Sequence, residues 1–323
     1  MDQSLPDLSV VVVAHIQDPV GIEKLNRTLS SISGNMSPVT LIDNASREPW
    51  ALRVRDSVEG HGGRYVRREV NNLGAARDQA LRLSNCTFLA FVDADVELPR
   101  DWLRTLRDFL ADPQNEACWG VASVLSAPRD SKFDRAMALA MSTPLAHLGT
   151  SQAAQIRGEK AVSHLATAGV LFRRQRVLDV GGFSDQFSRV GEDLELSYRL
   201  MRASGATLRR LVLLPQPIVT HHQDESLGTW VARVFRYGWS QCEVARIHPR
   251  HIVSRKLIPF LIGAVGLVSL GAAIMGYPMP LAILLIQYVT LVFGVVVGGA
   301  MVAGALAFAP LAILIVIVTH LAY

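Results

Sequence analysis

The sequence predicts an α/β domain with a mostly parallel sheet, followed by a C-terminal segment of transmembrane helices. Three observations lead to this prediction. Short β-branched runs alternate with helical patterns along the first part of the chain, as in folds where helices cover a parallel sheet. Acidic residues follow two of the predicted strands. Residues 257–323, 67 in all, contain no Asp, Glu, Lys or Arg, which excludes a disordered chain, a coiled coil and a plain soluble enzyme.

The elements of the α/β domain follow from apolar runs and turn residues. The run LSVVVVA is typical of a strand buried on both faces. Pro99 suits the first turn of a helix, where its missing N–H would have no partner. In chain order, we predict a strand at residues 8–14, a helix at 20–32, strands at 38–42 and 64–70, a helix at 73–83, a strand at 87–92, a helix opening at Pro99, a helix at 194–204 and a strand at 211–219.

Asp93 and Asp95 form the strongest local signal for a site. They directly follow the strand at 87–92. Hard divalent cations such as Mg²⁺ and Mn²⁺ take one or two carboxylates together with substrate phosphates. Asp43 ends the strand at 38–42, and ligands of parallel sheets bind beyond the carboxyl ends of the strands. We therefore expect Asp43, Asp93 and Asp95 at one edge of the sheet.

Two further clusters point to the same region. Glu192 and Asp193 come before the helix at 194–204, and the helix macrodipole favours ionised carboxylates there. His221 and His222 follow the strand at 211–219, and a neutral imidazole beside the Asp pair would complete a metal site. The simpler alternatives are charge complementarity at a helix end and two surface histidines. The sequence does not decide which histidine is the ligand.

Seven motifs in this order resemble a membrane-anchored, bacterial-type family 2 glycosyltransferase with the GT-A fold. They are LSVVVVAH, TLIDNAS, NNLGAARDQAL, FVDADVELP, AGVLFRRQRVLDVGGF, GEDLELSYRL and VTHHQDES, and the resemblance covers roughly residues 7–230. Two positions depart from the family pattern. Asp78 stands where Asn is more usual, and no Gln-x-x-Arg-Trp motif follows the histidine pair, which argues against a processive polymerase.

The resemblance implies a role for each matching residue. Asp193 would be the general base, with Glu192 beside it. Asp95, His221 and Asp93 would hold Mg²⁺ or Mn²⁺, and Asp93 would meet the ribose or the metal. The nucleotide sugar would be bound by Ala14, His15, Asp43, Asn72, Arg77, Asp93 and Ala94.

The expected reaction is an inverting transfer of one sugar from a UDP-, GDP- or dTDP-sugar. The acceptor would be a hydroxyl of a lipid-linked or cell-envelope glycan, and nucleic acid is not expected because no basic block is long enough. Two alternatives stay open. A polyprenyl-phosphate sugar synthase would use a phosphate acceptor and need no base, and an inactive family member would serve as a membrane scaffold.

The charge-free tail predicts membrane insertion. Residues 257–277 match the length of one span, Pro278 to Pro280 break the run, and the glycine-rich stretch at 298–304 divides the rest, which gives three spans, or two if the end is re-entrant. Arg246, Arg250, Arg255 and Lys256 precede the first span, so the N-terminal domain would be cytoplasmic at the plasma or inner membrane. Residues 133–148 and the aromatic, basic stretch 227–248 would contact the headgroups or pack on the domain. The expected organisation is a catalytic domain (1–225), a juxtamembrane helix (226–256) and a transmembrane segment (257–323).

Overall fold

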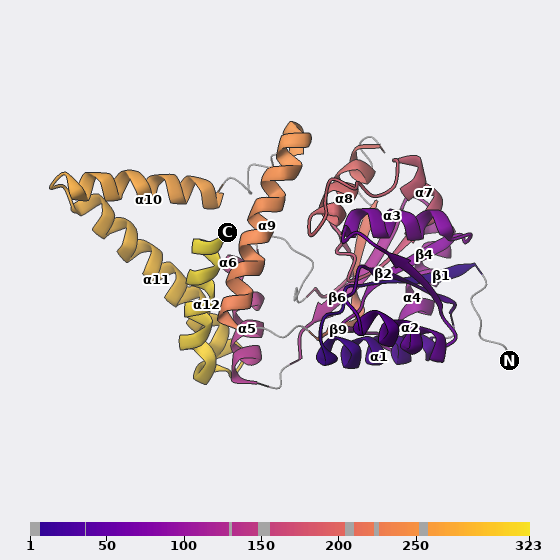
Figure 1. Cartoon of the computed structure of the whole chain (residues 1–323). Coiled ribbons are helices and arrows are strands. Elements are labelled where there is room, and N and C mark those ends of the chain that lie inside the picture. Colours follow the sequence, from indigo (N-terminus) through magenta and orange to yellow (C-terminus); the bar gives the residue numbers. More distant parts are fainter. Residues whose placement is uncertain are drawn as a thin grey trace. The chain divides into compact units, whose positions relative to one another are not determined.

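The computed structural model of the chain divides into two compact units (Figure 1). It describes residues 7–35, 37–128, 131–147, 156–203, 210–222, 226–251 and 258–323. The first unit contains residues 1–128 and 155–223, and the second contains residues 129–154 and 224–323. Residues 129–154 thus group with the C-terminal helices, whereas we expected them within a domain at 1–225. Arg255, Lys256 and Leu257, where we placed the start of the first span, lie outside the described residues.

The first unit is built on a nine-stranded sheet with the order β3-β2-β1-β4-β8-β6-β9-β5, and β7 pairs with β9. Strands β1 to β4 are parallel, as predicted, and β6 is parallel to β9. Strand β8 runs antiparallel between β4 and β6, and β5 and β7 are antiparallel to β9. The strands are β1 (Leu8–Ala14), β2 (Val39–Asn44), β3 (Arg64–Arg68), β4 (Phe88–Asp93), β5 (Val96–Glu97), β6 (Gly120–Ser126), β7 (Lys160–Ala161), β8 (Gly169–Arg173) and β9 (Leu211–His221).

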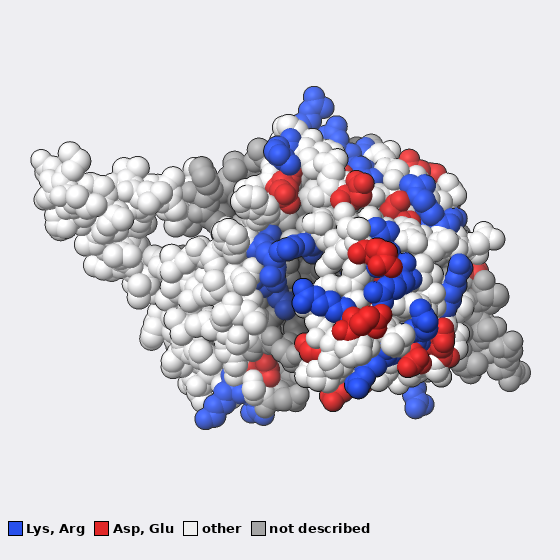
Figure 2. Space-filling model, in the orientation of Figure 1, with Lys and Arg blue, Asp and Glu red and all other residues white. Residues whose placement is uncertain are grey.

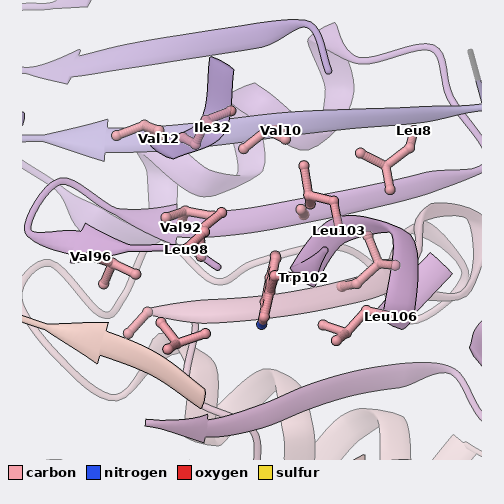
Figure 3. Close-up of a cluster of buried hydrophobic side chains, with 14 of the residues drawn as sticks. Leu8, Val10, Val12, Ile32, Val92, Val96, Leu98, Trp102, Leu103 and Leu106 are labelled. Carbon is pink, nitrogen blue, oxygen red and sulfur yellow. The ribbon is translucent and has the colours of Figure 1, made fainter. Parts of the chain in front are cut away.

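Helices cover both faces of this sheet. One buried cluster joins the sheet to α1, α2 and α4, and Figure 3 shows part of it around Trp102, whose indole N–H donates to Ser123 Oγ at 2.8 Å. The other cluster joins the opposite face to α3, α7 and α8. Val10 and Val12 of β1 belong to the first cluster and Val11 and Val13 to the second, which confirms a strand buried on both faces. These helices are α1 (Pro19–Ser33), α2 (Trp50–Gly60), α3 (Leu73–Leu83), α4 (Trp102–Ala111), α7 (Arg174–Asp179) and α8 (Glu192–Ala203).

The second unit is helical, and its own apolar core lies between α5, α9, α11 and α12. Trp230 on α9 donates its indole N–H to Thr319 Oγ1 on α12 at 2.8 Å. His320 connects three elements, because Nδ1 pairs with the Tyr288 hydroxyl at 2.8 Å and Nε2 with the Leu145 carbonyl at 2.9 Å. The helices are α5 (Lys132–Ser142), α6 (Pro144–His147), α9 (Leu227–Ile247), α10 (Ile258–Ile274), α11 (Met279–Val302) and α12 (Ala309–Ala322).

Helices α10 and α11 end near the two breaks that the sequence predicts. Helix α10 ends before Pro278, and α11 ends just before Gly304, which takes a left-handed φ of 63°. Figure 2 shows no charged side chain on α10 and α11. Among the described residues, α11 alone is long and apolar enough to cross a membrane, judged by length and composition. The other two apolar helices are shorter, so the structure supports one candidate span and does not support the multi-pass arrangement that we expected.

Candidate active site

The sheet register brings the predicted acidic residues to one edge. Ala14, the last residue of β1, is paired with Asp43 on one side, and Val13 is paired with Asp93 on the other. The carboxyl ends of β2, β1 and β4 therefore meet, as strand ends of a parallel sheet do. The expectation that Asp43 and Asp93 share one edge is confirmed.

Asp93, Asp95 and His221 offer one ligand atom each within 4.8 Å of one another. Ligands about 2.1 Å from a Mg²⁺ or Mn²⁺ ion lie roughly 3 to 4 Å apart, so this spacing fits one shared divalent cation. The chemistry also fits, because carboxylates suit hard cations and imidazole suits several divalent metals. His221 Nε2 lies 3.0 Å from Asp95 Oδ1, and an ion bound here would replace that contact.

A short antiparallel pairing places His221 in this cluster. Strand β5 turns back immediately after Asp95 and pairs with β9, with Val96 opposite His221. The backbone N–H of His222 donates to the Asp95 carbonyl at 2.8 Å. The His222 ring points to a different partner, Glu97 Oε2 at 3.0 Å. Between the two histidines that the sequence left open, the geometry selects His221 as the residue beside the Asp pair.

Arg77 links this cluster to the start of α8. Its Nη2 donates to Asp93 Oδ1 at 2.7 Å, and its Nη1 donates to Glu192 Oε1. The side chains of Arg77 and Glu192 are almost fully buried. Because its guanidinium is bonded to two protein carboxylates, Arg77 is a connecting residue here, and Glu192 is its partner.

Glycines allow the loop before α8 to approach α3 closely. Gly182 takes φ 78°, and a Cβ at this position would overlap the carboxylate of Asp78. That carboxylate accepts the backbone N–H of Phe183 at 3.1 Å, and Arg82 binds it from the next turn of α3. Asp78 thus anchors the Gly-Gly-Phe turn. Arg199 of α8 donates to the Gly182 carbonyl at 2.6 Å and fixes the other side of the turn.

Asp193 lies at the first turn of α8 and keeps a charged carboxylate. Burial raises its pKa, but the neighbouring His164 and then Arg77 lower it, and the N–H of Leu194, which donates to Oδ1 at 2.7 Å, lowers it further. The net direction is a pKa below the ordinary value of an aspartic acid. A carboxylate that stays ionised at neutral pH can accept a proton.

Asp43 is fully buried and holds two loops together. Its Oδ2 accepts the hydroxyl of Tyr65 at 2.6 Å, and its Oδ1 accepts the N–H of Ser46 at 2.9 Å. Ser46 Oγ in turn accepts the N–H of Ile16 at 2.8 Å, so the segments after β1 and β2 are connected. Burial, followed by the bond to Asp43 and its charge, raises the pKa of Tyr65 to about 12.

The remaining predicted binding residues surround the same edge. His15 is exposed and pairs through Nδ1 with the Asn44 carbonyl at 2.9 Å. Asn72 caps α3 by accepting the N–H of Ala75 at 2.9 Å, and its amide donates to the Asp185 carbonyl at 2.7 Å. Ala94 lies between the two metal-site aspartates and packs against the apolar core. The side-chain oxygen and nitrogen of Asn72 are therefore both bonded within the protein.

Two residues at this site, Tyr65 and His164, were not predicted from the sequence. Tyr65 lies on β3 in register with Leu41, so its proximity to Asp43 follows from the strand pairing and not from a motif. His164 Nε2 lies 3.3 Å from Asp193 Oδ2, although the residues are far apart in the sequence. A single histidine outside any motif offers no signal for such a contact.

Comparison with known proteins gives a family and a fold. A family model described as "Glycosyl transferase family group 2" matches residues 88–318. The pre-mycofactocin glycosyltransferase of Mycobacterium tuberculosis, in two strains, is 31% identical over 234 residues, which cover 70% of this chain. The chain spans 45% of the length of that relative.

Two solved structures are similar in fold. A mannosyltransferase from Pyrobaculum calidifontis, in complex with GDP-Man and Mn²⁺, has a TM-score of 0.63 at 19% identity and covers 96% of this chain and 86% of its own. Residues 1–349 of TarS from S. aureus, in complex with UDP-GlcNAc, have a TM-score of 0.51 at 14% identity, with 80% of each chain covered. At these identities the likeness concerns the fold, and it confirms the predicted GT-A architecture.

Proposed function

The chain belongs to glycosyltransferase family 2, and from this premise we propose that it transfers one sugar from a nucleotide-diphosphate sugar to an acceptor hydroxyl at a membrane, with inversion at the anomeric carbon. The observation on which the proposal rests is the bridge made by Arg77. Its guanidinium joins Asp93 of the metal cluster to Glu192, the residue before Asp193. One buried side chain thus joins the metal cluster to the start of α8, where the proposed base Asp193 follows Glu192.

The metal cluster is proposed to bind the diphosphate end of the donor. Asp95, His221 and Asp93 would hold Mg²⁺ or Mn²⁺. The cation would offset the negative charge that builds on the diphosphate as it leaves. The similar mannosyltransferase was solved with GDP-Man and Mn²⁺, which supports a nucleotide-sugar donor and a divalent metal for this chain.

Asp193 is proposed as the general base. The acceptor oxygen attacks the anomeric carbon, its proton passes to the Asp193 carboxylate, and the electron pair of the breaking C–O bond leaves with the diphosphate. This single displacement inverts the anomeric centre. The carboxylate stays ionised before the reaction because nearby charges lower its pKa. It needs no strong basicity, since the hydroxyl loses its proton only as the new bond forms.

The nucleotide is proposed to lie beside the loops after β1 and β2. Asp43 holds these loops through Ser46, and the exposed His15 and the backbone at Ala14 border them. Asn72 and Arg77 then act indirectly, because their polar atoms are bonded within the protein. In this proposal Ala94 contributes its backbone between Asp93 and Asp95.

The second unit is proposed to place the chain on or in a membrane. The apolar window of α11 is only 11% buried, whereas the core helix of a soluble protein would be mostly covered. Helix α9 packs one face against α12 and exposes Val231, Phe235 and Trp239 on another. Aromatic side chains with Arg236 and Arg246 nearby suit the headgroup layer. The acceptor would then be lipid-linked or emerge at the membrane.

The test begins with the nucleotide. Thermal unfolding of the purified chain is followed with UDP, GDP and dTDP, each with and without Mn²⁺, and one of them is expected to raise the unfolding temperature only when the metal is present. The matching radiolabelled nucleotide sugars are then offered with three acceptors: a bacterial lipid extract, polyprenyl phosphate and pre-mycofactocin, for which the relative is named. Absence of both metal-dependent protection and sugar transfer would refute the proposal.

A further inference from the structure

His164 lies beside Asp193, the proposed base, in the segment between β7 and β8. Its Nε2 is 3.3 Å from Asp193 Oδ2, and the two side chains are 25% and 20% exposed. The Nε2 atom is buried and makes no hydrogen bond within the described residues. A buried nitrogen without a hydrogen bond is costly, so a small rotation that directs it to the carboxylate is favourable.

The fold fixes this histidine from both sides. Before it, β7 pairs with β9, and the N–H of Val162 donates to the Leu211 carbonyl at 2.9 Å. After it, Leu165 is fully buried, and its N–H donates to Ser197 Oγ at 3.3 Å. Ser197 lies on α8, one turn after Asp193. The segment is thus bonded to the same helix that holds the carboxylate, and His164 has little freedom to move away.

Among the described residues, three elements supply charged and polar groups that face Asp193. His164 comes from the segment between β7 and β8, Arg77 comes from α3, and Glu192 and the N–H of Leu194 belong to α8 itself. Arg77 is already bonded to Asp93 and Glu192. His164 is therefore the side chain among these whose nitrogen lies against Oδ2 of Asp193, at 3.3 Å.

We propose that His164 is a positioning residue for the transfer reaction, which orients the Asp193 carboxylate by directing Nε2 to its Oδ2. This inference rests on the proposed function for the role of Asp193 as the base. The N–H of Leu194 holds Oδ1, and a small rotation of His164 would bring Nε2 into a hydrogen bond with Oδ2, so the plane of the carboxylate would be set before the acceptor arrives. A misplaced catalytic group costs about a hundredfold in rate for a shift of 1 Å.

The first test titrates Asp193 without any substrate. The full chain is labelled with ¹³C at the aspartate carboxyl carbons, and the Asp193 signal is identified by its loss in Asp193→Asn. The shift of this signal is then recorded over a range of pH, which gives the midpoint of the Asp193 titration. His164→Ala and His164→Gln are expected to raise the midpoint, because a group that lowers the pKa of Asp193 is gone. His61→Ala, which alters a histidine at the end of α2, is the matched control and should leave it unchanged. An unchanged midpoint in both His164 variants would overturn the inference.

The second test measures transfer with the nucleotide sugar found in the panel above. His164→Ala is expected to lower kcat about 10- to 100-fold with little change in KM for the donor, and to move the acid limb of the pH profile to higher pH. His164→Gln, which keeps a hydrogen-bond donor, should recover part of kcat. Loss of donor binding in step with kcat would instead indicate a structural role and overturn the inference. If no nucleotide sugar reacts, the proposed function fails, while the substrate-free titration still decides the pairing.

Discussion

Arg77 and Asp93 are joined by a hydrogen bond of 2.7 Å between Nη2 and Oδ1, and the same guanidinium reaches Glu192 on α8. Two segments of the sequence, one at the end of β4 and one 99 residues later at the start of α8, are thereby fixed to α3. Asp93 belongs to the metal cluster and Glu192 precedes the proposed base. The distance between the two halves of the site is consequently set by a buried side chain.

Replacement of Arg77 by Met should destabilise the first unit. The change leaves two carboxylates without their cation, and breaking a buried ion pair costs about 3 to 5 kcal/mol. Arg77→Lys should lose less stability than Arg77→Met, because the lysine ammonium keeps the charge but cannot span both carboxylates. Urea unfolding followed by tryptophan fluorescence measures the change. Arg82→Met on the same helix, which removes an exposed ion pair with Asp78, should change stability little. Equal losses at both positions would contradict the proposed bridge.

The metal cluster predicts that nucleotide binding depends on Asp95 and His221. Asp95→Asn and His221→Ala should each abolish the part of nucleoside diphosphate binding that requires Mn²⁺, because each removes one of the three ligand atoms. Calorimetric titration with and without Mn²⁺ measures the nucleoside diphosphate affinity of each variant. His222→Ala is the matched control, since its ring pairs with Glu97 outside the cluster. If nucleotide binding no longer depends on Mn²⁺ in His222→Ala but still depends on it in His221→Ala, then His222 and not His221 is the metal ligand.

Asp193→Asn should separate binding from chemistry. The variant keeps the shape of the side chain but cannot accept the proton, so donor affinity should stay near normal while transfer falls about 10² to 10⁴-fold. Asp179→Asn, a change of the same type at an exposed residue of α7, is the control. Transfer at a normal rate to polyprenyl phosphate, which needs no base, would favour the sugar-phosphate synthase over the hydroxyl acceptor.

Much of the fold could be predicted because short, continuous stretches of sequence define many of its strands and helices. The strand at 8–14 and the helix at 73–83 have the observed bounds, since a β-branched run and a capped amphipathic pattern define them without help from the rest of the chain. Strands β5, β6, β7 and β8 were not predicted. All four pair with antiparallel neighbours from distant parts of the sequence, and two have only two residues, too few for any periodicity.

The site residues at the ends of parallel strands could be predicted from the sequence. The contacts that arise from tertiary packing could not. Asp43 and Asp93 come together because parallel strands end at one edge. The bond between Arg77 and Glu192 joins residues 115 positions apart, and His164 meets Asp193 because its segment is bonded to α8 at Ser197. No spacing in the sequence specifies such contacts. The structure supports one candidate span among the described residues, where three were expected, because apolar composition does not fix helix length.

The hydroxyl of Tyr65 should stabilise the fold in a pH-dependent way. Tyr65→Phe removes a hydrogen bond to a buried carboxylate, at a cost of about 1.5 kcal/mol near neutral pH. The pKa of Tyr65 is raised to about 12 in the folded protein, so its contribution is complete below the unfolded value near 10 and is lost as the pH rises through 12. Urea unfolding of both proteins between pH 7 and 12 should therefore show the difference shrinking above pH 10. A constant difference over this range would exclude the pairing with Asp43.

Charged residues on the exposed face of α11 should release the chain from membranes, if this helix spans the bilayer as proposed. Val289 and Phe293 are both more than half exposed and lie one turn apart near the middle of the helix. Replacing both with Arg adds roughly 5 to 7 kcal/mol to insertion, at about 2.5 to 3.5 kcal/mol for each charge at a helix centre. The packing of α11 against α5 and α12 uses Val292, Val296 and Ala300, which stay unchanged.

The measurement is the fraction of chain that remains in the membrane pellet after carbonate extraction, which should fall sharply. Val20→Arg with Leu52→Arg adds the same charge to exposed positions on α1 and α2 and should leave that fraction at the wild-type level. Retention of the α11 variant at the wild-type level would show that this helix does not cross the membrane.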